Sequence, residues 1–237
     1  MVASHSYALT VLAAADPPVI SDDPSRHQGY LTREERKKLY GDAFDARESL
    51  LDAAAAEALP WILTSDGESI LPAVFHSCSS GSTESAENVW GRAIPCLSAV
   101  ESPGDLTAPG YRQDFAFPMQ EAMDILAENF PDAAPFRGPV KVTAVSPSGT
   151  VLTVSADGFS CTGQEFRRVF SLPSACFTIT ETADTLTFTT LGRGHGVGMS
   201  QYGAEAMALA GSSWQEILAH YYPGSVLVKI SLQDAPI

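Results

Sequence analysis

The spacing of apolar and polar residues divides the chain into a helical beginning, a strand-rich middle and a helical end. Residues 2–15 form an Ala-rich segment with apolar side chains at helical spacing, and Asp16-Pro17-Pro18 ends it. Thr32 begins the sequence TREE, a capping box that predicts a helix as far as Gly41. A further helix is predicted over residues 45–59.

The middle of the chain changes to the shorter period of β-strands. The runs WILT and SILPAVFH flank Asp66-Gly67, a dipeptide that is typical of a hairpin turn. An amphipathic helix is predicted over residues 118–129. Short strands follow it, with turns at SPSG and DG, and then the strands CFTIT and TLTFTT.

The last part returns to helix. Gly211 stands where a helix C-cap belongs, and Ser213 to Glu216 forms a second capping box before ILAHYY. We therefore predict an α+β fold as a single compact domain over 1–237. Its parts are a helical segment (1–60), a mainly stranded segment (61–190) and a glycine loop with a terminal helix pair (191–225).

Charge and hydropathy exclude several classes of partner. The chain has 28 acidic and 14 basic residues, a formal net charge of −14, which argues against nucleic acid or an anionic membrane surface as the main partner. No apolar run approaches the 18 residues of a membrane span. The N-terminus has no basic n-region, so we do not predict a signal peptide.

The cysteines do not have the spacing of a zinc ribbon, because none of the four belongs to a C-x-x-C pair. Cys161 and Cys176 flank a strand-rich segment and would suit a disulfide in an oxidising compartment. The alternative is that they are buried free thiols.

The most unusual stretch is LGRGHGVGMSQYGAEAMALAG, residues 191–211, where glycines alternate with other residues around His195. The spacing fails the dinucleotide fingerprint, lacks the lysine of a P-loop and misses the G-x-S-x-G elbow by one residue. Bare backbone at a strand end lets a ligand or a second backbone approach closely. The helix that opens at Met199-Ser200-Gln201 offers free N–H groups to an oxygen-rich ligand.

A second stretch, FHSCSSGSTESAENVWG over residues 75–91, concentrates a histidine, several hydroxyls and a glutamate. Two such loops at strand ends predict the walls of a polar groove, whose hydroxyls and amides suit a sugar polymer better than a charged cofactor. The residues predicted to line it are His76, Ser77, Ser80, Gly81, Thr83 and Glu84 from one loop and His195, Gly196, Gly198, Ser200 and Gln201 from the other.

The segments GRGHGVGMSQYGAEAMA, ILAHYYPGS, FHSCSSGSTESAENVWG and SAVESPGD together resemble the stage II sporulation protein D and amidase enhancer LytB family (SpoIID/LytB). The resemblance implies an extracytoplasmic cell-wall protein that acts on peptidoglycan. It implies a lytic transglycosylase that cleaves the MurNAc–GlcNAc bond of strands without stem peptides, and needs no cofactor. One acid serves this chemistry, whereas hydrolysis would use two carboxylates. The implied partners are the glycan strands and an amidase that removes the peptides.

The chain departs from the family pattern at the catalytic acid. The family's glutamate lies on a helix of which MVASHSYAL matches only the last part, so it would fall before Met1. Either Met1 is an internal residue of a longer chain, whose preceding segment would also provide membrane attachment, or the protein is a truncated or degenerate member. The helix that begins at residue 2 without a cap favours the first explanation. Some members carry metal-binding Cys and His residues after this helix. Here ISDDPSRHQGY keeps only His27, so no metal is predicted.

Several alternatives stay open from the sequence. Glu84 is a weak substitute for the acid, and its other role is to pin the loop by hydrogen bonds to backbone N–H groups. The protein is then either a transglycosylase or a non-catalytic module that binds glycan or enhances an amidase. A third hypothesis is a Cys/His or Ser/His hydrolase built from His76, Cys78, Ser200 and His195.

Overall fold

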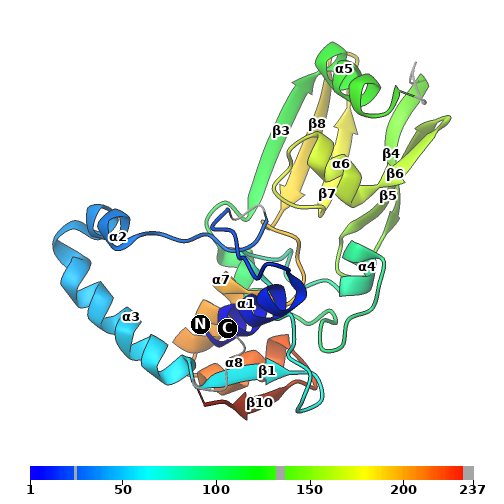
Figure 1. The fold of residues 1–237 in the computed structure, drawn as a ribbon. Helices are drawn as coiled ribbons and strands as arrows, with labels where there is room; N and C mark the ends of the chain where they lie inside the picture. The colour runs from blue at the N-terminus through cyan, green and yellow to red at the C-terminus, as the bar shows by residue number, and fades with distance from the viewer. Residues whose placement is uncertain (24–25, 132–136, 232–237) are drawn as a thin grey trace. The chain divides into compact units, whose positions relative to one another are not determined.

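The computed structural model describes residues 1–23, 26–131 and 137–231 (Figure 1). The predicted α+β class is confirmed. Contacts within the chain divide it into two compact units, Met1–Val74 with Gly224–Ile237, and Phe75–Pro223. No helix in the described part of the chain is long and apolar enough to cross a membrane.

The first unit combines three helices with a two-stranded antiparallel sheet: α1 (Val2–Ala14), α2 (Arg33–Tyr40), α3 (Phe44–Ala58), β1 (Trp61–Thr64) and β10 (Val226–Lys229). The predicted capping box at Thr32 is present at the start of α2. A buried hydroxyl fixes α1 on the sheet, because Ser6 Oγ donates to Val2 O and accepts from Leu63 N at 2.8 Å.

The hairpin predicted around Asp66-Gly67 forms only in part. A single bridge joins Thr64 to Ile70, and Asp66 Oδ1 accepts from Glu68 N and Ser69 N in the turn. The partner of β1 along its whole length is β10, more than 160 residues later in the chain. Local turn chemistry therefore predicted the turn, but it gave no information on this distant partner.

The second unit contains two three-stranded antiparallel sheets. One has the order β3-β8-β7, from β3 (Arg112–Pro118), β7 (Phe177–Glu181) and β8 (Thr185–Leu191); the other has β4-β5-β6, from β4 (Arg137–Val145), β5 (Val151–Asp157) and β6 (Phe159–Thr162). Helices α5 (Met119–Asn129) and α6 (Gly163–Val169) pack with them around an aromatic core that includes Phe166, Phe170, Phe177 and Phe188.

The remaining elements of the second unit carry the two loops singled out by the sequence. They are β2 (Phe75–His76), α4 (Ala86–Trp90), the 3-10 helix η2 (Pro103–Thr107), β9 (Met199–Ser200), α7 (Gln201–Leu209) and α8 (Trp214–Tyr221). The capping box predicted at Ser213 begins α8, and Gly211 follows α7 with a positive φ of 97°.

Strand β3 and helix α6 were not predicted. In β3 the sequence RQDFAFP alternates in burial but runs directly into α5, so its last residues were assigned to that helix. Helix α6 begins at a capping box, TGQE, in which Thr162 and Glu165 exchange hydrogen bonds. The TGQE pattern is visible in the sequence and would have predicted this helix start.

Candidate functional site

The two His/Gly/Ser loops lie side by side in the second unit. Strands β2 and β9 pair in parallel, with Phe75 opposite Met199 and His76 opposite Ser200. Further along, Arg193 N donates to Cys78 O at 2.7 Å. The structure therefore brings together two segments that are more than 100 residues apart, and we call them the loop pair (residues 75–84 and 192–201).

The glycines of the second loop are bare because the first loop lies against them. A Cβ on Gly192 would stand 2.7 Å from Cys78 O, and one on Gly194 would stand 2.7 Å from His76 Cβ. At Gly196 the nearest atom would be Glu84 Cβ at 3.5 Å, an ordinary contact. Close approach of a second backbone therefore accounts for the first two glycines, whereas Gly196 leaves room.

One side of the loop pair is held by Asp105, whose side chain is completely buried (0% exposed). Its Oδ2 accepts from Ser79 N at 2.8 Å and from Ser79 Oγ at 2.5 Å, and its Oδ1 accepts from Ser200 Oγ at 2.5 Å. Ser200 Oγ also accepts from Gly203 N and so caps helix α7. We call Asp105 with Ser79 and Ser200 the Asp105 cluster.

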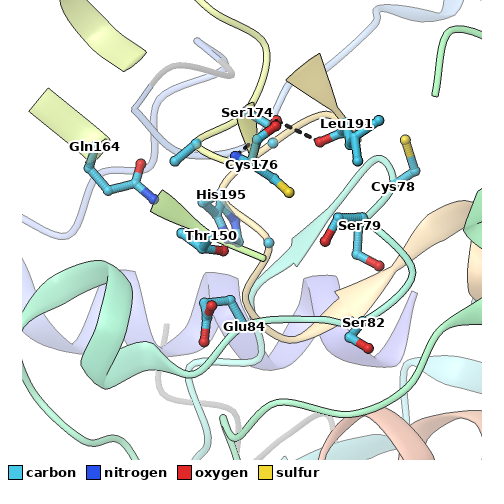
Figure 2. Close-up of a pocket in the computed structure, with 14 residues that line it drawn as sticks. Cys78, Ser79, Ser82, Glu84, Thr150, Gln164, Ser174, Cys176, Leu191 and His195 are labelled. Carbon is cyan, nitrogen blue, oxygen red and sulfur yellow. Dashed lines mark hydrogen bonds between the residues drawn. The ribbon is translucent and has the colours of Figure 1, made fainter. Parts of the chain in front are cut away.

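The loop pair also lines a small pocket of about 20 Å³, to which Ser79 of the Asp105 cluster contributes (Figure 2). Polar side chains are the most numerous in its lining: Ser79, Ser80, Ser82, Glu84, Thr150, Gln164, Ser174 and His195. Ala175, Leu191 and the thiols of Cys78 and Cys176 add a less polar wall. The volume exceeds the ~10–15 Å³ that one water needs, and it is far too small for a sugar ring.

The two histidines are neutral, and one residue between them fixes the tautomer of each. His76 Nδ1 lies 3.1 Å from Val197 O, which only accepts, so this nitrogen carries the proton. Val197 N donates to His195 Nδ1 at 3.1 Å, so that nitrogen is unprotonated. Burial lowers the pKa of His76 to about 4, and burial with the neighbouring His76 lowers the pKa of His195 to about 3.

Glu84 is 2% exposed, and both of its carboxylate oxygens are engaged. Oε1 accepts from Ser85 N at 2.8 Å and from Asn88 Nδ2 at 3.0 Å, and Oε2 accepts from Ser146 Oγ at 2.5 Å. The backbone N–H of Glu84 donates to Gly196 O at 2.7 Å. The carboxylate thus pins its own loop, the role that the sequence offered as the alternative to acid catalysis.

Two side chains at this site were not predicted from the sequence. Gln164 lines the pocket from the first turn of α6. Gly163 lets this turn pack closely against β5, since a Cβ at that position would stand only 2.0 Å from Val151 O. Trp90, the last residue of α4, is 42% exposed, and its ring centroid lies 5.5 Å from that of His195. A tryptophan at the end of a Ser-rich polar stretch is a signal that the sequence did contain.

The predicted site residues separate into two groups. Ser80, Glu84, His195 and Gly196 line the pocket. The others lie outside its lining. The ring of His76 lies beside that of His195, and the carbonyls of Ser77 and Gly81 accept from Tyr202 N and Ser102 N. Thr83, Gly198 and Ser200 are buried, and Gln201 is exposed at the start of α7.

A larger groove of about 790 Å³ adjoins the pocket and shares Cys176 and Leu191 with it. Strands β4 and β7 form its sides, with Val142 and Ile179 among the apolar lining residues and the exposed cations Arg112 and Lys141 among the polar ones. The sequence placed a groove between the two loops. The structure has the small pocket there, and the groove lies along the strands.

The hydrolase hypothesis finds no nucleophile–base pair in the described residues. Ser200 Oγ donates to Asp105, and the His76 Nδ1 proton is directed to Val197 O. Burial raises the pKa of the Cys78 thiol, which keeps it protonated. Cys161 and Cys176 are free thiols. No group of three or more His, Cys, Asp or Glu side chains suited to a metal occurs in residues 1–23, 26–131 and 137–231.

Comparison with known proteins identifies the class. No family model matches the chain. Stage II sporulation protein D of Bacillus subtilis strain 168 is 37% identical over 214 residues, 90% of this chain and 60% of its own length. The protein of the same name from Bacillus amyloliquefaciens is 36% identical over 90% of this chain and 60% of its own length. An amidase enhancer of B. subtilis is 53% identical over 51 residues, which are 21% of this chain and 7% of the enhancer's length.

The chain belongs to the family of stage II sporulation protein D and the amidase enhancer. It spans 60% of the length of the two sporulation relatives.

Proposed function

We propose that this chain binds peptidoglycan glycan strands outside the cytoplasm during the cell-wall remodelling of sporulation. The pocket and the adjoining groove hold the strand at the MurNAc–GlcNAc bond that a lytic transglycosylase cleaves. The observation that supports this most is a polar lining, with a single carboxylate whose oxygens already accept hydrogen bonds, beside an exposed indole. The pocket's carboxylate, Glu84, already accepts hydrogen bonds, and the imidazole of His195 is neutral.

The indole of Trp90 is the natural contact for a sugar ring. Its large apolar surface is 42% exposed, and it is held in place against the His195 ring. Sugar rings present C–H groups on one face, which pack on an aromatic surface, while their hydroxyls bind polar side chains at the edge. The sugar ring would lie at the mouth of the pocket, since the pocket is too small to hold the sugar ring itself.

The transglycosylase reaction needs one acid. That acid protonates the glycosidic oxygen, and its carboxylate then takes the proton of the C6 hydroxyl, which closes the anhydro ring. Glu84 is not suited to this role, because its side chain is only 2% exposed and both carboxylate oxygens already accept hydrogen bonds from the protein. We assign no catalytic acid among the described residues.

The same observation favours a second candidate, a non-catalytic module that holds glycan for an amidase partner. In this role the engaged Glu84 and the neutral histidines are positioning groups, and the pocket needs no acid. The local similarity to an amidase enhancer supports the partnership.

Binding tests the part that both candidates share. Glycan strands without stem peptides should bind the wild-type chain, and Trp90→Ala should weaken that binding about tenfold, a loss of ~1.4 kcal/mol that matches one aromatic contact. Leu209→Ala is the control, since Leu209 is 84% exposed on α7 and does not line the pocket. Equal binding by Trp90→Ala and wild type would remove the indole from the site, and no binding by wild type would reject the proposal.

A digest separates the two candidates. Glycan strands are incubated with this chain and with a version extended at its N-terminus by the in-frame genomic sequence, and products are analysed by mass for the anhydro sugar. Anhydro products from the extended version alone support the transglycosylase. Their absence from both supports the non-catalytic module, and activity of the shorter chain would return Glu84 to consideration.

A further inference from the structure

The pocket contains one buried side-chain amide donor that no described residue accepts from. Gln164 Nε2 is buried and has no hydrogen-bond partner among the described residues. In Figure 2 the amide nitrogen lies on the side of Gln164 that faces Thr150 and His195. A buried N–H without a partner destabilises the folded state, so its position next to a pocket calls for a ligand acceptor.

The orientation of this amide is fixed by its neighbour. Gln164 Oε1 accepts from Arg167 Nη1 at 3.5 Å, and a guanidinium has only donors, so the oxygen must face it and the NH₂ group must face away. Arg167 is itself held by the carbonyls of Leu172 and Pro173. The donor is therefore presented by a rigid arrangement.

The rest of the lining defines the complementary group. The hydroxyls of Ser82 and Thr150 make no hydrogen bond within the described residues, so each is free to accept an N–H. Ala175 and Leu191 offer apolar contacts at the same pocket. A ligand that complements the Gln164 amide, the two hydroxyls and the apolar wall has a carbonyl for the amide donor, an N–H for a hydroxyl and a methyl group for the apolar wall.

We infer that the pocket binds the acetamido group of an N-acetylated hexosamine. This rests on the proposed glycan binding and specifies the part of the sugar that is recognised. The volume of about 20 Å³ admits a substituent of a few heavy atoms and no ring, so the sugar stays at the mouth beside Trp90. A free amine at the same carbon is disfavoured, because an ammonium group would direct its donors at the Gln164 N–H.

The test compares three forms of the same peptide-free glycan strands: N-acetylated, de-N-acetylated, and de-N-acetylated then N-propionylated. Dissociation constants are measured for wild type, Gln164→Leu and the control Gln120→Leu, whose exposed amide on α5 bonds to Asp124. Wild type should prefer the acetyl form to the amine and to the propionyl form by about tenfold each, one hydrogen bond and one excess methylene.

Gln164→Leu should bind the acetyl and amine forms within about twofold of each other, since the donor to the acetyl carbonyl is removed. The control should keep the wild-type preference. If wild type binds all three forms equally, the pocket holds only water and the inference is wrong while glycan binding stands. Tighter binding of the amine form would show that Glu84 selects a cation. If no form binds, the proposed function fails as well.

Discussion

The two sides of the loop pair use the same residue types to different ends. Around Asp105, the hydroxyls of Ser79 and Ser200 donate to one carboxylate that is completely buried. Around the pocket, both carboxylate oxygens of Glu84 also accept hydrogen bonds, but the amide donor of Gln164 has no partner among the described residues. The first arrangement stabilises the loops, and only the second leaves a group for a ligand to satisfy.

This comparison changes the role of residues that the sequence grouped together. Ser200 and Glu84 were both predicted to touch glycan. Ser200 is buried in the Asp105 cluster, where it caps α7, whereas Glu84 lines the pocket with its own oxygens engaged. A polar residue in a glycine-rich loop is therefore no sufficient sign of ligand contact. The unpaired donor is the more direct sign.

Removal of the central carboxylate should have the largest effect. Asp105→Ala leaves Ser79 N and Ser79 Oγ as buried donors without an acceptor, and Ser200 Oγ keeps only Ser77 O at 3.3 Å. At about 1–3 kcal/mol for each of the two, the free energy of unfolding should fall by about 4 kcal/mol. Urea denaturation measures it. A loss below about 1 kcal/mol would show that the cluster does not hold the loops together.

The Asp105 cluster also shows what sequence reasoning could not reach. Asp105 lies in SPGD, a segment that matched the family, but its partners are 26 and 95 residues away. Local signals, such as the capping boxes at Thr32 and Ser213, are encoded within four residues and were predicted correctly. Pairings set by the packing of distant segments have no such local signature.

The pocket was predicted in part for the same reason. That two His/Gly/Ser loops form one site followed from composition, and the structure does bring them together. Gln164 comes from a third segment and occupies an ordinary helix N-terminus, so nothing local marks it. The glycines of the second loop did not distinguish two explanations. A glycine without Cβ is needed both where a second chain segment approaches closely and where a ligand does.

The histidines between the two sides should make stability depend on pH. Both folded-state pKa values, about 4 for His76 and about 3 for His195, lie below the usual 6.5, so the unfolded chain binds more protons in acid. The stabilisation is therefore present above pH 6.5 and is lost as the pH falls toward 4. At pH 5 the loss should be about 2 kcal/mol for each histidine.

The matched variant for this prediction is His76→Asn. The Asn amide can still donate to Val197 O, as His76 Nδ1 does, but it does not titrate. Urea unfolding of wild type and variant at pH 8, 6 and 5 should give a pH dependence about half as steep for the variant. A wild-type stability that stays constant from pH 6.5 to 5 would contradict the buried, neutral state of both rings.

The smallest effect on stability should come from alanine substitutions at Gly192 and Gly196, and comparing the two separates the stabilising contacts from the pocket. Both have positive φ, 76° at Gly192 and 82° at Gly196, so alanine costs about 1–2 kcal/mol of backbone strain at either position. Gly192→Ala adds a contact of 2.7 Å with Cys78 O, whereas Gly196→Ala adds only an ordinary contact with Glu84 Cβ. The first variant should therefore be less stable than the second by about 2 kcal/mol.

The effect on binding should have the opposite order. Gly196 lines the pocket and Gly192 does not, so a methyl group at 196 reduces a space of only about 20 Å³. Gly196→Ala should weaken binding of N-acetylated glycan strands several-fold at a temperature where it remains folded, and Gly192→Ala should bind normally once folded. Urea midpoints and dissociation constants of the two variants decide the matter. If stability and binding fall together in both, the loop pair acts as one unit, and the separation into a stabilising side and a binding side is wrong.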